Sequence, residues 1–468
     1  MKSSIIAYVS QFFRNLLLNA SGAERTLYEY IEDGDISHAL NLMESNAADV
    51  DNALKEYYPQ KHDVMKRGYK RTPRGTYELC KLPRARQRYI NEIELFFLLA
   101  NGIMFKKDEG DDEAYKLFTD FIKDTRYDTN MRKIKRMAGS ETECAKLYRL
   151  YKDDNNKPQC DTVLLSRSLG YDLRILKDQY GHLVAFAYGY NLRGADGKAV
   201  QHWDFLTPTM TYECAKGGVG WDVESYANPT GRINLVYYRQ PKAWEGAEPR
   251  LKREEEMDSK IGDTNNYFAD PIALASADVI ESMFEPSTPA KLLQATGKDS
   301  RFEYVNPPQA SELRTAEKED LKDSILFDTF TPDFSFDKLR GMGTLSGVAI
   351  RNAMALGYIK RANRMEIYGE LVDRDVKVII GVLQFLNPDM AAKLGELQIS
   401  FEFAEPFQTD KRDEWQSIVT LYSGGLVSLE EAVRRLGLTE DPVAELERIM
   451  AEKSEQEPLY FGTEEETE

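Results

Sequence analysis

The longest regular pattern of apolar positions in the chain lies between residues 345 and 387. Apolar side chains recur there at spacings near three and four, and no proline occurs between Leu345 and Pro388. This periodicity is typical of an α-helix with one buried face. We expect one long helix, or two collinear ones, of about 40 residues and about 60 Å at 1.5 Å per residue. Such a helix exceeds what a single compact domain usually needs, so it indicates an elongated, multi-domain chain.

A short glycine-bearing loop precedes this helix. Pro332 ends the element before it, and Gly341, Gly343 and Gly347 then give the backbone conformational freedom. A dinucleotide fingerprint would need the third glycine one residue earlier and a strand in front, and a phosphate-binding loop would need a lysine after Gly347. The spacing therefore favours a mobile loop between helices over a nucleotide site.

Helical patterns also dominate the first third of the chain. The run Ile90–Ala100 is strongly apolar, so we expect this helix to be buried. The other helices predicted in this region span residues 24–32, 37–43, 49–58, 114–122 and 130–151.

From Asp161 the period of the pattern changes to two, which is typical of strands. The strands predicted here span residues 162–168, 172–177, 182–191, 199–206, 209–215, 221–226 and 234–239. Glycine-containing turns separate several of these runs, and helices do not alternate with them. The region is therefore predicted to be an antiparallel sheet, and the fold class is α+β.

Two further helical patterns, at residues 244–268 and 309–330, flank a segment with short β-like runs at 280–284, 291–296 and 301–305. After Pro388 the sequence predicts a strand at 397–403. Three helices follow, the first capped by Thr409 or Asp410, the second opened by Ser428 with Glu431 and ended by Gly437, and the last started by Asp441-Pro442.

Composition and charge narrow the function classes. The chain has 468 residues and a net charge of −17, so it can form two to four domains and has no general preference for polyanions. Its four cysteines and four histidines lack metal-ligand spacing, which predicts reduced thiols, a cytoplasmic compartment and no metal or other cofactor. Gln11 and Arg14 interrupt the apolar start, which favours a packing helix over a signal peptide. No run of about 18 apolar residues predicts a membrane span.

One stretch is basic, from Lys66 to Arg88, and three tyrosines are interleaved with its cations. Phosphates attract such clusters and aromatic rings stack on bases, so a nucleic-acid contact is one interpretation. The favoured alternative is a solvated or inter-subunit face that balances the acidic remainder of the chain.

The order of these elements resembles the portal proteins of tailed bacteriophages, of the siphophage type with a helical stem and a β-containing clip. The residues that carry this resemblance are Gly231–Tyr238, Arg253-x-Glu255, Ser259-x-x-x-Asp263 through Pro271, Phe330–Phe336, Thr344–Ile350, Ile399–Phe403 with Pro406, Ser428–Ala432 and Asp441–Glu447. The similarity covers roughly residues 90 to 450, and it rests on the order of the motifs.

The resemblance implies an arrangement of parts. These are an N-terminal helical region (1–60), a wing of helices and antiparallel strands (61–240), a stem helix (241–268), the clip (269–308), a second stem helix (309–331), a tunnel loop (332–344), a long helix with a wing strand (345–408), crown helices (409–453) and an acidic disordered tail (454–468).

The resemblance also implies a function and partners. Family members form a homo-oligomeric ring, usually dodecameric, at one capsid vertex of the virion, after assembly in the host cytoplasm. Double-stranded DNA passes through the ring during packaging and ejection. The implied partners are the terminase large subunit, a head-to-tail adaptor, and the major capsid and scaffolding proteins.

The resemblance places residues 333–343 in the DNA channel. The side chains then expected to touch DNA are Phe334, Phe336, Lys338 and Arg340, with Gly341 and Gly343 as hinges. The alternative is that the loop packs against its own stem, with both phenylalanines buried.

The two stem segments are acidic: residues 245–270 carry eight acids and four bases, and residues 311–328 carry six acids and three bases. Acidic channel walls would favour sliding of DNA, although a solvated helix face would look the same. Apolar stem residues such as Leu251, Met257, Ile261, Leu313 and Leu326 are expected to be covered by neighbouring stems.

A second function class is a phosphoester- or nucleotide-processing enzyme on an α+β scaffold. It would need a metal or a nucleophile–base pair, and no such arrangement is visible; Asp373 and Asp375, two apart on a helix, do not face each other. The expectation is therefore a protein without enzymatic activity.

Overall fold

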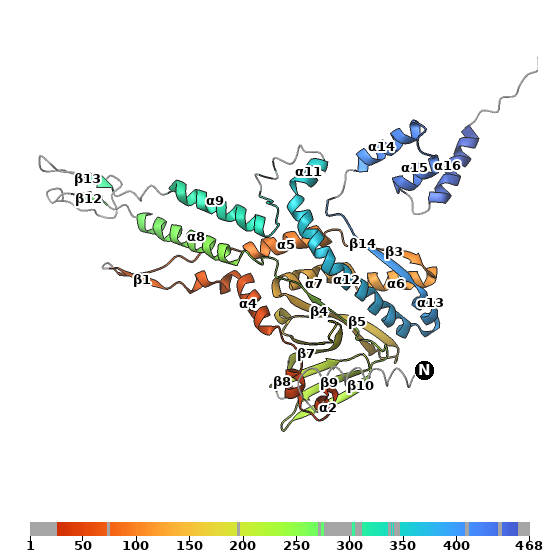
Figure 1. The fold of residues 1–468 in the computed structure, drawn as a ribbon, viewed down its shortest axis with the longest axis horizontal. Coiled ribbons are helices and arrows are strands. Elements are labelled where there is room, and N and C mark those ends of the chain that lie inside the picture. Colours follow the sequence, from red (N-terminus) through yellow and green to blue (C-terminus); the bar gives the residue numbers. More distant parts are fainter. Residues whose placement is uncertain are drawn as a thin grey trace, which may run out of the picture. The chain divides into compact units, whose positions relative to one another are not determined.

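The computed structural model describes residues 26–72, 75–193, 197–269, 273–275, 302–304, 311–335, 338, 340, 347–407, 411–438 and 442–456. The chain forms two compact units. The larger unit spans residues 1–339 and 354–406, and the smaller unit spans residues 340–353 and 407–468. Helices and strands are both plentiful, and every strand pair within the described residues is antiparallel, which confirms the α+β class (Figure 1).

Antiparallel sheets form one part of the larger unit. A five-stranded sheet has the order β10-β9-β8-β7-β6 and a three-stranded sheet the order β11-β4-β5. The strands are β4 (Glu143–Lys152), β5 (Pro158–Leu165), β6 (Asp172–Lys177), β7 (Leu183–Arg193), β8 (Ala199–Leu206), β9 (Met210–Lys216), β10 (Trp221–Ala227) and β11 (Leu235–Arg239). Residues such as Ile175, Phe186 and Leu235 form an apolar cluster that both sheets share.

Two short helices, α2 (Leu27–Glu32) and α3 (Ile36–Asn41), pack on the five-stranded sheet. Ile31 and Ile36 are fully buried against Phe205 and neighbouring side chains of that sheet. Thr26 and Glu29 form a reciprocal capping box at the start of α2, which satisfies two backbone N–H groups that the helix leaves unpaired. The predicted helices at 24–32 and 37–43 are therefore confirmed.

The main helical core lies against β4 and β11. It consists of α5 (Arg86–Leu99), α6 (Asp112–Asp124), α7 (Tyr127–Glu141) and α12 (Ala355–Leu386). The helix α12 has 32 residues and buries a face that includes Val372, Val376 and Ile379. At Gly357 a Cβ would overlap the ring of Phe97, so only glycine allows α5 and α12 to approach this closely. The separate helix α11 (Gly347–Ala353) accounts for the rest of the long apolar pattern.

The predicted helix at 130–151 is wrong beyond Glu141. Thr142 adopts a left-handed backbone with φ +69°, and residues 143–152 form β4 instead. The first six residues of β4 are buried on both faces, so the apolar–polar alternation of a strand is lost. Lys146 is among them, and it pairs with the buried Asp375 of α12, which also accepts hydrogen bonds from Tyr148 (2.7 Å) and Tyr238 (3.2 Å).

Besides β4 and the short strand at 273–275, three strands were not predicted from the sequence. They are β1 (Tyr69–Thr72) and β2 (Gly75–Glu78), which form a hairpin, and β3 (Ile103–Glu109), which pairs with β14 (Gln398–Phe403). The strand β14 was predicted, but its partner precedes it by almost 300 residues in the sequence. Pairing over that separation leaves no local signal.

Within the larger unit, an antiparallel helix pair projects away from the helical core (Figure 1). It consists of α8 (Glu248–Ala269) and α9 (Ser311–Asp328), close to the predicted helices 244–268 and 309–330. Pro249 lies in the first turn of α8, where proline is tolerated. Beyond them a short ladder joins β12 (Ala273–Ala275) and β13 (Phe302–Tyr304). The predicted runs 280–284 and 291–296 lie outside the described residues.

The smaller unit contains α11 and three C-terminal helices, α14 (Lys411–Ser423), α15 (Leu429–Leu436) and α16 (Pro442–Gln456). Ser428 caps α15 by accepting a hydrogen bond from the Glu431 N–H (3.2 Å), and Gly437 ends that helix with φ +58°. Both caps were predicted. Thr409, Asp410 and most of the acidic tail lie outside the described residues.

Candidate functional site

The base of the α8–α9 pair is fixed by an aromatic and apolar cluster. Trp244 is fully buried, stacks on Tyr57 with ring centroids 5.8 Å apart, and donates a hydrogen bond from Nε1 to Glu56 (2.8 Å). Lys242 forms a second contact with Glu56 (2.6 Å). Leu251 of α8 and Ile325 of α9 complete the cluster. The helix pair is therefore attached to the larger unit by packed side chains rather than by a flexible linker.

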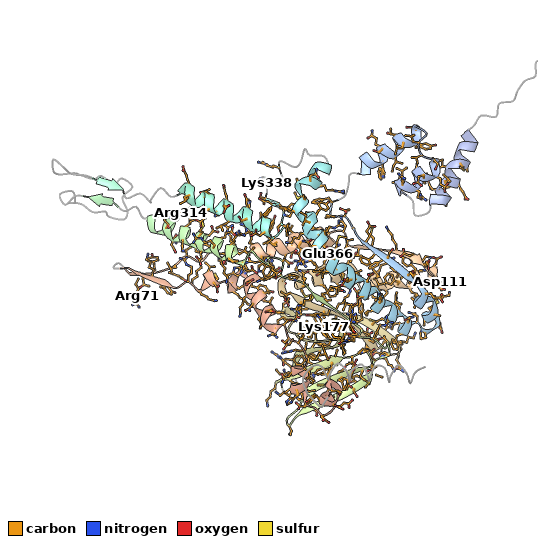
Figure 2. All side chains as sticks on the ribbon, viewed as in Figure 1. Arg71, Asp111, Lys177, Arg314, Lys338 and Glu366 are labelled. Carbon is orange, nitrogen blue, oxygen red and sulfur yellow. The ribbon has the colours of Figure 1, made fainter. Side chains whose placement is uncertain are left out.

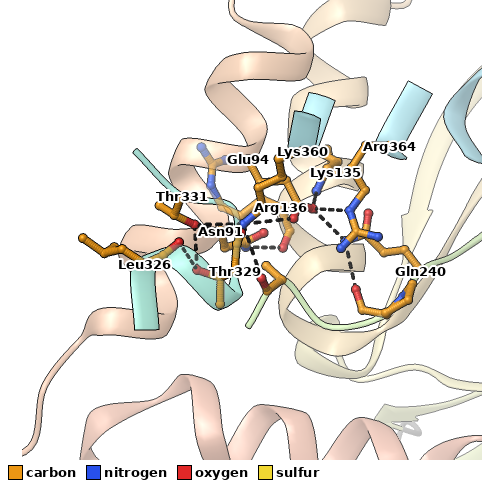
Figure 3. A network of polar contacts seen from close by, with 12 residues as sticks. Asn91, Glu94, Lys135, Arg136, Gln240, Leu326, Thr329, Thr331, Lys360 and Arg364 are labelled. Carbon is orange, nitrogen blue, oxygen red and sulfur yellow. Dashed lines mark hydrogen bonds and ion pairs between the residues drawn. The ribbon is translucent and has the colours of Figure 1, made fainter. Parts of the chain in front are cut away.

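A buried ionic network lies next to this base (Figure 3). Its centre is Glu94 of α5, which is 1% exposed and contacts Lys135 of α7. Arg364 Nε lies 3.0 Å from Oε1 of Glu94, and Lys360 Nζ lies 3.5 Å from Oε2. Gln240 also donates a hydrogen bond to Glu94 (3.0 Å). One carboxylate thus joins α5, α7, α12 and the segment that leads into α8.

The electrostatics of this network follow from burial and from the excess of cations. Burial opposes ionisation of Glu94, but Lys135, Lys360 and Arg364 outweigh it and hold the pKa of Glu94 well below its usual range. Burial lowers the pKa of Lys360 to about 8; the neighbouring cations act in the same direction and Glu94 opposes them. The network is therefore anchored by a permanent carboxylate.

Lys360 connects the network to both ends of the helix pair. Its Nζ donates hydrogen bonds to the backbone oxygen of Ala243 (3.4 Å), just before α8, and to Thr331 Oγ1 (3.1 Å), just after α9. Thr331 in turn lies next to Thr329, with 2.9 Å between their hydroxyl oxygens. A single side chain of α12 thus touches the root of each helix of the pair.

The segment after α9 turns back onto α5. The Tyr89 hydroxyl donates to the Pro332 carbonyl oxygen (2.9 Å) and accepts from the Phe334 N–H (2.8 Å). Asp333 forms an ion pair with Lys322 of α9 (2.6 Å) and caps the Ser335 N–H. Residues 332–335 are therefore held by specific hydrogen bonds to the body of the subunit.

The residues predicted to contact DNA occupy different environments. Phe334 is half-buried, and its ring lies 6.1 Å from that of Phe96 and 6.3 Å from that of Phe97. In the single chain Phe334 therefore packs on α5 of its own subunit. Lys338, which is labelled in Figure 2, is exposed. Arg340 is exposed as well. Phe336, Gly341 and Gly343 lie outside the described residues, and DNA contact remains a prediction for the set.

The basic stretch divides into two parts. Its two ends contact α8: Arg67 pairs with Asp263 (2.6 Å), Arg84 with Asp258, and Arg86 with Glu254. Residues between these ends form the β1–β2 hairpin, where Arg71, labelled in Figure 2, is exposed. Lys70 is exposed as well. The two ends of the basic stretch therefore balance acidic charge on α8 of the same subunit.

Residues 80–84 run along α8 as an extended segment. The backbone N–H groups of Cys80, Leu82 and Arg84 donate to side chains of α8. The acceptors, in the same order, are Asp263 (2.6 Å), Ser259 (3.0 Å) and Glu255 (2.8 Å). Two extended residues rise about 6.6 Å, and four helical residues rise about 6.0 Å. The two spacings match, which explains physically why the pattern Glu255-x-x-x-Ser259-x-x-x-Asp263 is present.

A buried histidine extends this contact. His62 Nδ1 lies 2.6 Å from Glu255 Oε1, and Nε2 lies 2.6 Å from the Glu56 carbonyl oxygen. Both neighbours accept hydrogen bonds, so both ring nitrogens must carry protons to satisfy them. Burial opposes the charge of His62, but Glu255 outweighs it and raises the pKa of the ring. The imidazolium form is thus part of the folded structure.

Two expectations about the stem need correction. The acids Glu254, Glu255, Asp258 and Asp263 are occupied by partners of the same subunit and do not form a free acidic wall. The apolar residues Leu251, Met257 and Leu326 are at most 6% exposed in the single chain, so a neighbouring stem is not needed to cover them. Leu251 packs in the cluster at the base of the helix pair, with Trp244 and Ile325 of the same subunit. Leu313, in contrast, is 73% exposed.

The residues that organise the joint between the helix pair and the helical core were not predicted from the sequence. Glu94 lies inside the strongly apolar run Ile90–Ala100, and an acid in the middle of a buried helix is a signal for a buried ion pair. Asp375 lies three residues after Val372 and four before Ile379, on the buried face of α12, whereas Asp373 is exposed. The prediction that the two aspartates do not face each other agrees with this.

Among the described residues, no group of three or more His, Cys, Asp and Glu side chains could hold a metal ion. In the same part of the chain, no helix has the length and apolar character needed to cross a membrane. The four cysteines are free thiols.

Comparison with known proteins gives one family match. The model described as "Phage portal protein, SPP1 Gp6-like" matches residues 48–459. No curated protein matches the chain. Two solved structures are similar at 11% sequence identity. A chain of "Neck of native GTA particle computed with C12 symmetry" has a TM-score of 0.37, with 76% of this chain and 91% of that chain covered. A chain of "Neck of empty GTA particle computed with C6 symmetry" has a TM-score of 0.42, with 85% and 95% covered.

Proposed function

This chain belongs to the SPP1 Gp6-like family of phage portal proteins, and we propose that it assembles as a closed homo-oligomeric ring, usually dodecameric in this family, through which double-stranded DNA passes. Portal proteins are structural channels rather than enzymes, so the alternative of a phosphoester- or nucleotide-processing enzyme is set aside. The place of the protein is the portal vertex of a phage-like particle.

The observation that supports the ring is the attachment of the α8–α9 pair. A protruding helix pair would be free to swing if only a linker held it. Here Trp244, Glu94 and Lys360 fix both of its roots to the helical core. A rigid joint of this kind suits a part that must keep one angle in every copy of a symmetric ring.

We assign the parts of the chain from the family resemblance. The helices α8 and α9 are the stem, β12 and β13 belong to the clip, the sheets form the wing, and α14 to α16 are crown helices. The terminase large subunit and the head-to-tail adaptor are assigned as ring partners, and the major capsid and scaffolding proteins as its surroundings.

The loop after α9 is proposed to meet the DNA. Tyr89 and Phe96 hold its first residues, so Phe334 serves as an anchor in the single chain while it remains a candidate for contact. Lys338 and Arg340 would neutralise phosphates transiently, because each such contact releases counterions and adds only a limited, salt-sensitive affinity. Phe336 would add an apolar contact, and Gly341 and Gly343 would let the loop shift.

The ring is tested by native mass spectrometry and negative-stain imaging of the purified protein. A closed ring with a central opening is expected, and a persistent monomer at micromolar concentration would contradict the proposal. The loop is tested by changing Lys338 and Arg340 to Gln in a packaging assay. Rings should form normally while packaged DNA decreases several-fold, because two phosphate contacts are lost. Replacing exposed Lys116 of α6 by Gln provides a matched control.

A further inference from the structure

The outer face of α9 carries charge that the subunit leaves unpaired. Glu312, Glu319, Asp320 and Asp323 are exposed, and within the described residues they form no hydrogen bond or ion pair. Two other acids of α9 are occupied, Glu317 by Arg253 (2.7 Å) and Asp328 by Arg250. The unpaired acids therefore form a group on one side of the helix.

Apolar side chains lie along the same face. Leu313 is 73% exposed and Phe327 is 65% exposed. Positions 312, 313, 316, 319, 320, 323 and 327 recur at spacings of three and four, so they form one stripe along α9. We call this set the α9 stripe. Acidic residues mixed with large exposed apolar ones are typical of a surface that another macromolecule covers.

The β1–β2 hairpin offers the complementary chemistry. Lys70 and Arg71 are exposed and form no ion pair within the described residues, and Tyr69 is 68% exposed. The hairpin is also positioned precisely, because Arg67 before it and the Cys80 N–H after it both bind Asp263 of α8. A basic and aromatic projection is thus fixed to the stem by the half-buried carboxylate of Asp263.

The hairpin and the helix α9 lie on different sides of α8 (Figure 1). The helix α8 binds the base of the hairpin through Asp263 and binds α9 through Arg253 and Asp258. Within one subunit the two surfaces are therefore separated by α8. In a head-to-tail ring, each interface joins two different surfaces of the same protein.

From this placement we infer that the β1–β2 hairpin of one subunit docks on the α9 stripe of the adjacent copy. Lys70 and Arg71 pair with acids such as Glu319 and Asp320, and the tyrosines cover the apolar positions. The inference rests on the ring proposed above, and it specifies which surfaces of adjacent subunits meet. The four unpaired acids of the α9 stripe would repel phosphate, so a second copy of this chain fits this surface better than nucleic acid does.

Charge reversal tests the pairing. The variants are Lys70→Glu with Arg71→Glu, Glu319→Lys with Asp320→Lys, and the combination of all four; Lys116→Glu on α6 is the matched control. Each double variant should lower ring yield about tenfold at low salt, since like charges at an interface cost several kcal/mol. The variant with all four substitutions should restore most of the ring yield, and Lys116→Glu should leave the ring yield unchanged.

Unfolding of each variant by denaturant separates assembly from folding, and the reversed residues are exposed, so subunit stability should change little. If all variants form wild-type rings with an unchanged salt dependence, the inference is wrong while the ring proposal stands. If the wild type forms no ring, the ring proposal fails first. If Lys70→Glu with Arg71→Glu leaves rings intact but weakens binding to labelled DNA, the hairpin is a nucleic-acid contact and the inference is overturned.

Discussion

The two stem helices look alike in sequence and differ in what their acids do. Both segments carry about twice as many acids as bases. On α8 the acids Glu254, Glu255 and Asp263 are buried or half-buried and bind cations or backbone N–H groups of residues 62–86. On α9 most acids are exposed and have no partner within the part of the chain that the structure describes. The net charge of a helix therefore does not reveal whether its acids form ion pairs inside the subunit or remain exposed on its surface.

The energetic difference follows from burial. Two charges removed from water are strongly coupled, and removing one partner leaves the other uncompensated. Exposed acids are solvated and screened, so their individual contribution to stability is small. The same residue type thus stabilises the subunit on α8 and remains available for assembly on α9.

The largest expected effect is on α8. Glu254 is 1% exposed and contacts Arg84 and Arg86, so Glu254→Gln leaves Arg86 without its carboxylate and leaves Arg84 with Asp258 alone. We expect the free energy of unfolding to fall by about 3 kcal/mol. Glu319→Gln on α9 is the matched control, with an expected change within about 0.5 kcal/mol. Chemical denaturation of both variants measures the difference, and equal effects would remove the distinction between the two helices.

The pH dependence of the α8 contact should be intermediate in size. The pKa of His62 is raised in the folded state, because Glu255 outweighs the effect of burial. A raised pKa means that the stabilisation is fully present below the unfolded value of about 6.5 and is lost as pH rises through the folded pKa. The free energy of unfolding of the wild type, relative to His62→Asn, should therefore decrease between about pH 6.5 and the folded pKa. An increase over that range would show that His62 is neutral when folded.

The smallest expected effect concerns the end of α9. Phe330 has φ +48°, and the hydrogen bonds Phe330 N–H to Phe327 O (3.0 Å) and Thr331 N–H to Leu326 O (2.8 Å) form a Schellman motif. Glycine is the usual residue at this left-handed position. Phe330→Gly should stabilise the subunit by about 0.5 kcal/mol, since relief of about 1–2 kcal/mol of strain exceeds the entropic cost of glycine.

The control for this substitution lies one turn earlier. Phe327→Gly places glycine inside the helix and should destabilise the subunit by about 1 kcal/mol. Thermal unfolding of the two variants gives the sign directly. If Phe330→Gly also destabilises, the phenylalanine side chain contributes more to packing than its backbone strain costs.

Local patterns were enough to predict most helices and the antiparallel sheets. The predicted caps at Ser428 and Gly437 were confirmed because capping depends on neighbouring residues only. The failures occurred where distant segments meet. Residues 143–151 have no clear alternation because β4 is covered on both faces, and β3 was missed because its partner, β14, is almost 300 residues away.

The sequence by itself determined the family, the order of helices and strands, and the acidic excess of both stem segments, because each of these depends on residue types and their spacing along the chain. Only the tertiary structure decided which charges are paired. Glu94 meets Lys135 and Arg364, and Asp263 meets Arg67, across long sequence separations. Coulomb energy depends on distance and burial rather than on sequence position. The same carboxylate can therefore be a buried anchor on one helix and an exposed contact on its neighbour.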